Sequence, residues 1–211
     1  MKGLILKDFY NMAKSFKFFL LIILIYGGIS YFNGSGAFLT FMIILISMMV
    51  PITALSTDEK DQWDVLGLTM PVTPLTMVGE KFLLALACCV IGLGGGLAVS
   101  LLFTVTGGQI SISEILSTLI PGAFISLLYN CVLLPVVYKF GCERGRVISI
   151  VVVMAPALVL MILEKQEMLP ELPVVLSWLK NTGGLIILIA VPVLFLISFF
   201  LSLHLYRAKE W

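Results

Sequence analysis

Long apolar runs separated by short polar segments dominate the chain. The first run without a charged side chain, Phe18–Thr57, is about twice the roughly 20 residues that cross a bilayer as a helix. Asn33-Gly34-Ser35-Gly36 in its middle is a turn signal that divides it into two helices. Each of the other four runs predicts one helix: Phe82–Ser113, Ile115–Tyr138, Val147–Leu163 and Asn181–Tyr206. The pattern therefore predicts an all-α integral membrane protein with six transmembrane helices.

Composition supports this interpretation. The 211 residues are 60% hydrophobic and 12% charged, whereas a soluble domain is about 25% charged. We expect one transmembrane domain over residues 1–211, with helices near 18–32, 37–56, 82–106, 117–138, 147–163 and 183–205. The net charge of +1 comes with no basic face, so we expect no nucleic-acid partner.

Positive charges fall mainly on one side of the predicted helices. Of the 13 lysines and arginines, all except Lys165 and Lys180 lie in the N-terminal segment, in the 57–81 loop, in the loop after the fourth helix or in the C-terminal tail. The positive-inside rule then places both termini in the cytoplasm.

The N-terminal residues 3–16 have an amphipathic pattern. Ile5, Phe9 and Met12 share one helical face, and Lys7 and Lys14 lie on the opposite one. The pattern predicts an interfacial helix with its lysines toward anionic head groups. The alternative is a cytoplasmic extension of the first transmembrane helix.

Glycines in the third predicted helix indicate close helix packing. Gly92 and Gly96 stand four residues apart and share one helical face. A nucleotide-binding loop is disfavoured, because no strand precedes these glycines and no lysine follows them.

The predicted outer segment 164–182 differs from the other turns because it contains Pro170, Pro173 and Trp178. It predicts a short helix at the outer interface, where tryptophan is enriched, or a plain extracellular loop.

Catalytic and metal-binding patterns are missing from the sequence. There is no nucleotide-binding loop, no His-Glu-x-x-His and no Gly-x-Ser-x-Gly, and the four cysteines have no metal-ligand spacing. We therefore expect no catalytic residue, no metal site and no cofactor bound by this chain. If the protein drives transport, another polypeptide must hydrolyse ATP.

The cytoplasmic loop 57–81 carries an unusual acidic patch. Ser56 and Glu59 have capping-box spacing and predict a short helix through about Leu66. Thr73-Pro74 then has the pattern of an N-cap followed by a first-turn proline, which starts the next helix. An acidic patch with one large aromatic suits a protein partner, and a solvated loop is the alternative. The candidate docking residues are Asp58, Glu59, Asp61, Trp63 and Asp64.

Several segments in this order resemble the permease subunits of ABC-2 type ABC transporters, specifically the small six-helix bacterial kind. They are the start Met1–Asp8, Asp58–Asp64 followed by Leu68–Val72, Glu80-Lys81, Lys139–Arg146 and the close Tyr206–Trp211. The chain departs from that pattern at Val72-Thr73-Pro74, where relatives often carry Ser-Arg.

The resemblance implies a bacterial cytoplasmic-membrane assembly of two permeases, here a homodimer, and two copies of an ABC ATPase subunit that binds ATP and Mg²⁺. Residues 3–16 would be a connecting helix and Asp58–Leu66 a coupling helix. Arg144 and Arg146 would make a second contact with the ATPase. The second and fifth helices of both copies would line the path. The segment 164–182, with Pro170, Pro173 and Trp178, would be its outer gate.

The cargo expected from the resemblance is an amphipathic or hydrophobic peptide, because similar small permeases export phenol-soluble modulins and other antimicrobial peptides. Export of lipids, drugs or ions is the alternative within the same class. A non-transporting sensor or immunity-type membrane protein is the alternative outside it, and that alternative predicts no ATPase partner. Membrane lipid is a partner in every case.

Overall fold

The computed structural model describes residues 2–33, 36–63, 73–105, 112–148, 151 and 184–208. These residues form long helices and no strand. The helices are α1 (Lys2–Asn33), α2 (Gly36–Lys60), α4 (Pro74–Val105), α5 (Ile112–Phe140) and α8 (Gly184–Ala208). Residues 142–148 are also helical. The prediction of an all-α protein is confirmed for this part of the chain.

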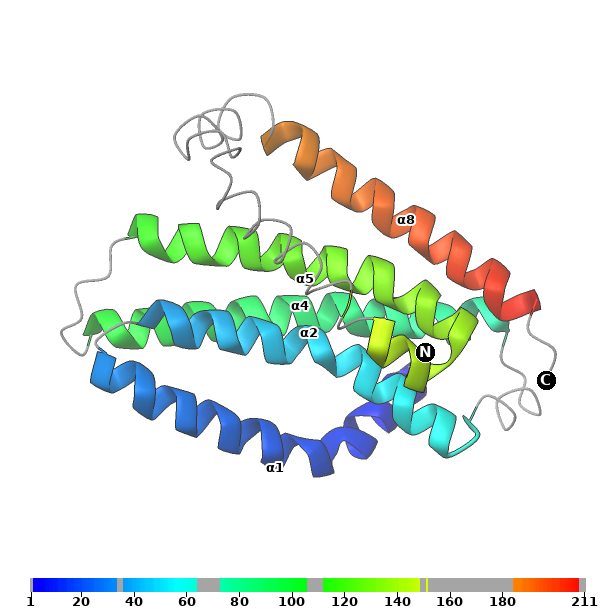
Figure 1. Cartoon of the computed structure of the whole chain (residues 1–211), viewed down its shortest axis with the longest axis horizontal. Helices are drawn as coiled ribbons and strands as arrows, with labels where there is room; N and C mark the ends of the chain where they lie inside the picture. The colour runs from blue at the N-terminus through cyan, green and yellow to red at the C-terminus, as the bar shows by residue number, and fades with distance from the viewer. Residues whose placement is uncertain are drawn as a thin grey trace.

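The long helices lie side by side along the length of the molecule (Figure 1). α2 is central, because it packs against α1, α4 and α5. The start of α1, the start of α4 and the ends of α2, α5 and α8 all lie at the same end of the bundle (Figure 1). We call this the inner end, since most of the lysines and arginines lie near it in the sequence.

Four helices are long and apolar enough to cross a membrane: Phe38–Lys60, Pro74–Thr104, Ile115–Phe140 and Ala190–Ala208. A shorter apolar helical stretch runs from Lys17 to Ser30. The protein is therefore a multi-pass membrane protein. The fifth predicted helix, 147–163, falls almost entirely outside the described residues. The segment 164–182 with Pro170, Pro173 and Trp178 and the docking candidate Asp64 also lie outside them.

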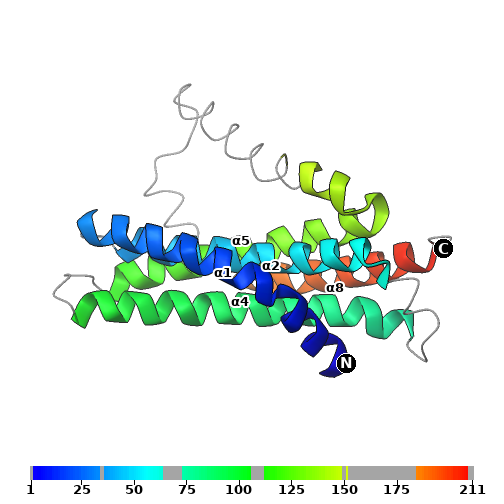
Figure 2. The same ribbon diagram turned by 90° about the horizontal axis from the view of Figure 1, so that it is seen from below.

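The N-terminal segment is not a helix of its own. α1 continues from Lys2 to Asn33 without interruption, because no glycine or proline occurs between Leu4 and Tyr26. Lys7 does not face outward from this segment as the amphipathic pattern predicted, since it contacts a carboxylate of α2. In Figure 2 the first turns of α1 cross beside the inner part of α4.

The 57–81 segment is helical at both of its ends. α2 continues through Ser56 to Lys60, so the predicted new helix does not begin at Ser56. Nothing in this stretch breaks the helix, and Gln62, with φ of 50°, is the first described residue that departs from helical geometry. Glu80 and Lys81 lie in α4 rather than in the loop.

The start of α4 matches its predicted cap. The backbone N–H of Thr76 donates to Thr73 Oγ1 at 3.4 Å, and Met77 N–H donates to the Thr73 carbonyl at 3.2 Å. Pro74 is the first helical residue, where its missing N–H and fixed φ cost nothing. These two residues determine where α4 begins.

α2 and α4 approach closely where α4 lacks side chains. A Cβ added at Gly92 would lie 2.7 Å from Ser47 Cβ, and one at Gly96 would lie 2.9 Å from Thr40 Cγ2. Hydroxyls complete the contact, with Thr40 Oγ1 3.0 Å from Ser100 Oγ and Ser47 Oγ donating to the Cys88 carbonyl. The predicted packing face therefore lies against α2.

α8 satisfies a carbonyl that a proline leaves free. Pro135 has no N–H to donate to the Cys131 carbonyl four residues earlier. Ser198 Oγ of α8 donates to that carbonyl at 2.6 Å. α8 also packs on the main apolar core, where Phe82 of α4 lies edge-on against Phe195 and Phe199 at 5.1 and 5.3 Å between ring centroids.

Candidate functional site: the inner end of the bundle

Five charged side chains from three helices meet at the inner end. They are Lys7 and Asp8 of α1, Asp58 of α2, and Glu80 and Lys81 of α4, and we call them the charge cluster. Lys81 is its centre. Its Nζ lies 2.6 Å from Asp8 Oδ2, 2.6 Å from Asp58 Oδ2 and 3.4 Å from Glu80 Oε1.

Lys7 closes the network from α1. Its Nζ lies 2.5 Å from Asp58 Oδ1 and 3.3 Å from Asp8 Oδ1. The Asp58 carboxylate therefore pairs with one ammonium group from α1 and with another from α4. One carboxylate at the end of α2 thus joins α1, α2 and α4.

The charge cluster is shielded from solvent. Asp8 and Glu80 are each 1% exposed, and Asp58 and Lys81 are each 4% exposed. Charges this deeply buried need partners, because leaving one of them unpaired costs several kcal/mol. The cluster therefore fixes the relative positions of the three helices and leaves little of itself for a partner protein to touch.

Three acidic side chains face two lysines in the cluster. Burial tends to raise the pKa of Asp8, but the hydrogen bond with Glu80 and the positive charges of Lys81 and Lys7 together hold that pKa below its ordinary value of 3.8. Asp8 therefore remains ionised at neutral pH and available to Lys81.

Trp63 lies against this network. The Lys7 ammonium sits 4.2 Å from the centre of the Trp63 ring, within cation–π range. The side chain is half-buried, and its indole N–H finds no acceptor among the described residues. Part of the Trp63 ring therefore packs on Lys7 of α1.

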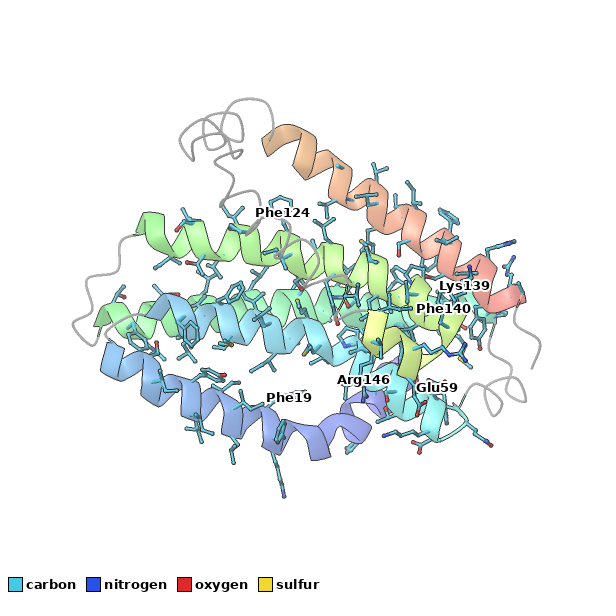
Figure 3. All side chains as sticks on the ribbon, viewed as in Figure 1. Phe19, Glu59, Phe124, Lys139, Phe140 and Arg146 are labelled. Carbon is cyan, nitrogen blue, oxygen red and sulfur yellow. The ribbon has the colours of Figure 1, made fainter. Side chains whose placement is uncertain are left out.

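A second contact joins the end of α2 to the helical residues 142–148. Glu59 Oε2 accepts a hydrogen bond of 2.6 Å from the backbone N–H of Cys142, the first residue of that helix. A carboxylate is favourable there because helix N-termini carry partial positive charge. Arg146 Nη2 also donates to Ser56 Oγ at 3.0 Å. Glu59 and Arg146 are labelled at this end of the bundle in Figure 3.

Gly141 makes the sharp turn that brings Cys142 to Glu59. Its φ of 81° is accessible to glycine, and its N–H donates to the Val137 carbonyl at 2.9 Å, which ends α5. A Cβ there would lie 2.9 Å from Glu59 Oε1. Figure 2 shows the residues after this turn rising out of the layer of long helices. Cys142, predicted in a loop, is buried in the core instead.

The predicted docking residues separate into two groups. Asp58 is buried in the charge cluster, so it cannot form part of an exposed acidic patch. Glu59 and Asp61 lie at the surface near the end of α2, and Arg144 and Arg146 lie at the surface of the 142–148 helix. We call the exposed polar and charged residues of these two segments the inner surface: Glu59, Lys60, Asp61, Gln62, Glu143, Arg144 and Arg146.

The inner surface is mixed in charge, not acidic. It contains the acids Glu59, Asp61 and Glu143 and the bases Lys60, Arg144 and Arg146. The acidic excess of the 58–64 segment is not present on this surface. Asp58 is neutralised by its buried ion pairs, and Arg144 and Arg146 contribute positive charge to the same surface. Sequence reasoning did not anticipate the roles of Asp8, Glu80 and Lys81.

The fold and this inner end define a helical membrane protein with its charged groups gathered where several spans meet. The family described as ABC-2 family transporter protein matches residues 3–207. The chain therefore belongs to the ABC-2 transporter family, and it is a permease component of an ABC transporter. Comparisons with curated proteins and with solved structures gave no match.

Proposed function

We propose that this chain is the permease subunit of an ATP-driven exporter. It forms half of a translocation path with a second copy of itself, and each copy binds one ATPase subunit at the inner surface. The chain contributes no catalytic residue. ATP and Mg²⁺ bind to the partner subunit in the cytoplasm, where both termini of this chain also lie.

The main support for the proposal is that contacts with other helices hold the inner end of α2 on two sides. Asp58 joins it to α1 and α4 through Lys7 and Lys81, and Glu59 joins it to the helix that follows α5. A force applied to the exposed residues next to these contacts reaches several spans together. A permease needs such an arrangement, because its work is to convert movement of a partner into a change of helix packing.

Replacing Arg144 should weaken binding of the ATPase subunit. Arg144 is exposed on the 142–148 helix, so Arg144→Ala removes a surface charge and leaves the core intact. We expect the amount of ATPase that copurifies to fall severalfold, since interface arginines are frequent binding hot spots. Arg207→Ala is the matched control, because Arg207 is also exposed near the inner end, at the end of α8. Equal copurification by the two variants would show that Arg144 is not part of the contact.

The proposed cargo is an amphipathic peptide. The composition supports it, since the spans are rich in methionine and phenylalanine and flexible methionine adapts to varied apolar shapes. We expect an amphipathic helical peptide to stimulate ATP hydrolysis by the assembled transporter in vesicles. A scrambled peptide of the same composition, without an apolar face, is the control. Equal stimulation by both peptides, or stimulation only by a drug or a lipid, would reject peptide cargo.

A further inference from the structure

The 142–148 helix needs a cap that the preceding residue cannot supply. Gly141 directly precedes this helix, and its carbonyl accepts a hydrogen bond of 2.9 Å from the N–H of Gly145. The side chain of a serine, threonine, aspartate or asparagine usually accepts from the first N–H groups of a helix. Gly141 has no side chain, and its φ of 81°, which ends α5, favours glycine at this position. The N–H of Cys142 therefore finds its acceptor on another element.

Glu59 of α2 provides that acceptor. Its Oε2 lies 2.6 Å from the backbone nitrogen of Cys142, and its Oε1 would lie 2.9 Å from a Cβ added at Gly141. The side chain is exposed, yet its carboxylate is turned toward the start of the 142–148 helix. A partner protein that bound this carboxylate would compete with the cap.

A second contact fixes the direction of the same helix. Arg146 Nη2 donates to Ser56 Oγ at 3.0 Å. Ser56 and Glu59 lie about one turn apart on α2, and Cys142 and Arg146 lie about one turn apart on their helix. The later residue of each pair contacts the earlier residue of the other, so the 142–148 helix runs antiparallel to the end of α2. Figure 3 labels Glu59 and Arg146 at this junction.

The 142–148 helix also lies closely against the end of α5. A Cβ added at Gly145 would lie 2.7 Å from Val137 Cγ2 and 3.5 Å from Val137 Cα. The helix therefore has one face on α2 and another on α5. It cannot rotate about its own axis without breaking one of these contacts.

Arg144 lies on the face that remains. At 3.6 residues a turn it is about 160° around the helix from both Cys142 and Arg146. Its side chain is exposed, and it makes no ion pair with the described residues. The contacts that hold Cys142 and Arg146 on α2 therefore turn Arg144 away from the bundle.

We propose that Glu59 is a positioning residue whose cap on the 142–148 helix, together with the contact between Arg146 and Ser56, orients Arg144 toward the ATPase subunit. Glu59 then supports ATPase binding through Arg144 and does not itself touch the partner. This inference rests on the proposed function, and it assigns different roles to residues of the inner surface.

The cap can be tested on the full chain alone, by hydrogen–deuterium exchange of the 142–148 backbone in mild detergent. We expect Glu59→Ala to speed this exchange severalfold, because a lost cap lets the helix open locally. Glu59→Gln should remain close to the wild type, since an amide oxygen still accepts from Cys142. Lys60→Ala is the matched control, because Lys60 is the next residue of α2 and is also exposed. Equal exchange in Glu59→Ala and Lys60→Ala would overturn the proposal.

A double-mutant cycle tests the action through Arg144. We expect Glu59→Ala to lower the amount of copurified ATPase severalfold and Glu59→Gln to restore it. In a chain that already carries Arg144→Ala, the Glu59→Ala substitution should cause no further loss, because the two residues then act on one contact. A further loss of the same size would overturn the proposal, since it would mean that Glu59 contacts the ATPase independently.

Ser56→Ala keeps the result independent of one substitution. It removes the hydroxyl that accepts from Arg146, and alanine favours the helix. If Glu59→Ala does not fold, we expect Ser56→Ala to speed exchange of the 142–148 backbone, and exchange at the rate of Lys60→Ala would overturn the proposal. A wild-type chain that copurifies with no ATPase would instead reject the proposed function, whereas the exchange experiment needs no partner. The two failures are therefore distinguishable.

Discussion

Lys81→Met is expected to be among the most destabilising single substitutions in this protein. Lys81 is 4% exposed and lies within 3.4 Å of carboxylate oxygens of Asp8, Asp58 and Glu80. Removing it leaves three buried acidic side chains with Lys7 as their one basic partner among the described residues. Breaking a buried ion pair from one side costs about 3–5 kcal/mol, and we expect a loss of that size in the free energy of unfolding, measured by denaturing titration in mixed micelles.

Two controls show whether the effect belongs to the charge cluster. Lys60→Met removes an exposed lysine near the end of α2 and should change stability little. Adding Asp8→Asn to Lys81→Met removes one uncompensated carboxylate and should recover part of the loss. A Lys81→Met variant as stable as Lys60→Met would mean that the cluster does not hold the helices together.

Gly92→Ala should destabilise the α2–α4 contact, whereas Gly94→Ala should not. A Cβ at Gly92 would lie 2.7 Å from Ser47 Cβ and 2.9 Å from Ser47 Oγ, so α2 must shift and the hydrogen bond from Ser47 to the Cys88 carbonyl is strained. Overpacking of this kind costs about 1–3 kcal/mol. A Cβ at Gly94 meets nothing within 4 Å, and alanine favours the helix over glycine.

The midpoint temperature of unfolding tests this prediction directly, because the two alanine substitutions lie only two residues apart on the same helix. We expect a lower midpoint for Gly92→Ala and an unchanged or higher one for Gly94→Ala. The same decrease in both variants would mean that backbone flexibility, and not close approach to α2, explains the glycines.

The helical architecture could be predicted because apolar runs of transmembrane length leave few other structures open to the chain. The cap at Thr73-Pro74 could also be predicted, since it depends only on neighbouring residues. Helix boundaries that no local sequence signal marks were predicted wrongly. The capping-box spacing of Ser56 and Glu59 suggested the start of a new helix, yet these residues continue α2, and Asp58 pairs with lysines on two other helices.

The charge cluster could not be predicted from local sequence. Asp8 and Lys81 are 73 residues apart, and only the packing of α1 across α4 brings them together. The sequence indicated that charges near positions 58–64 form a functional surface. It did not show that Asp58 is used internally while Glu59 contacts the 142–148 helix. Contacts in the folded structure thus separate the acidic patch into residues that are buried in ion pairs and residues that remain exposed.

The two halves have different consequences for the proposed function. Variants of Lys81 or Asp58 alter the positions of α1, α2 and α4, so a loss of transport in them does not identify a docking residue. Variants of exposed residues such as Arg144 and Asp61 leave the ion pairs intact. The exposed residues are therefore the right ones for testing contact with an ATPase.

The most direct test of the central claim is the native mass of the complex purified in mild detergent from its source membranes, with no partner added. The account predicts a particle that contains two copies of this chain and two copies of an ATPase subunit. A particle that contains only this chain would contradict it, because the inner surface would then have no ATPase to bind.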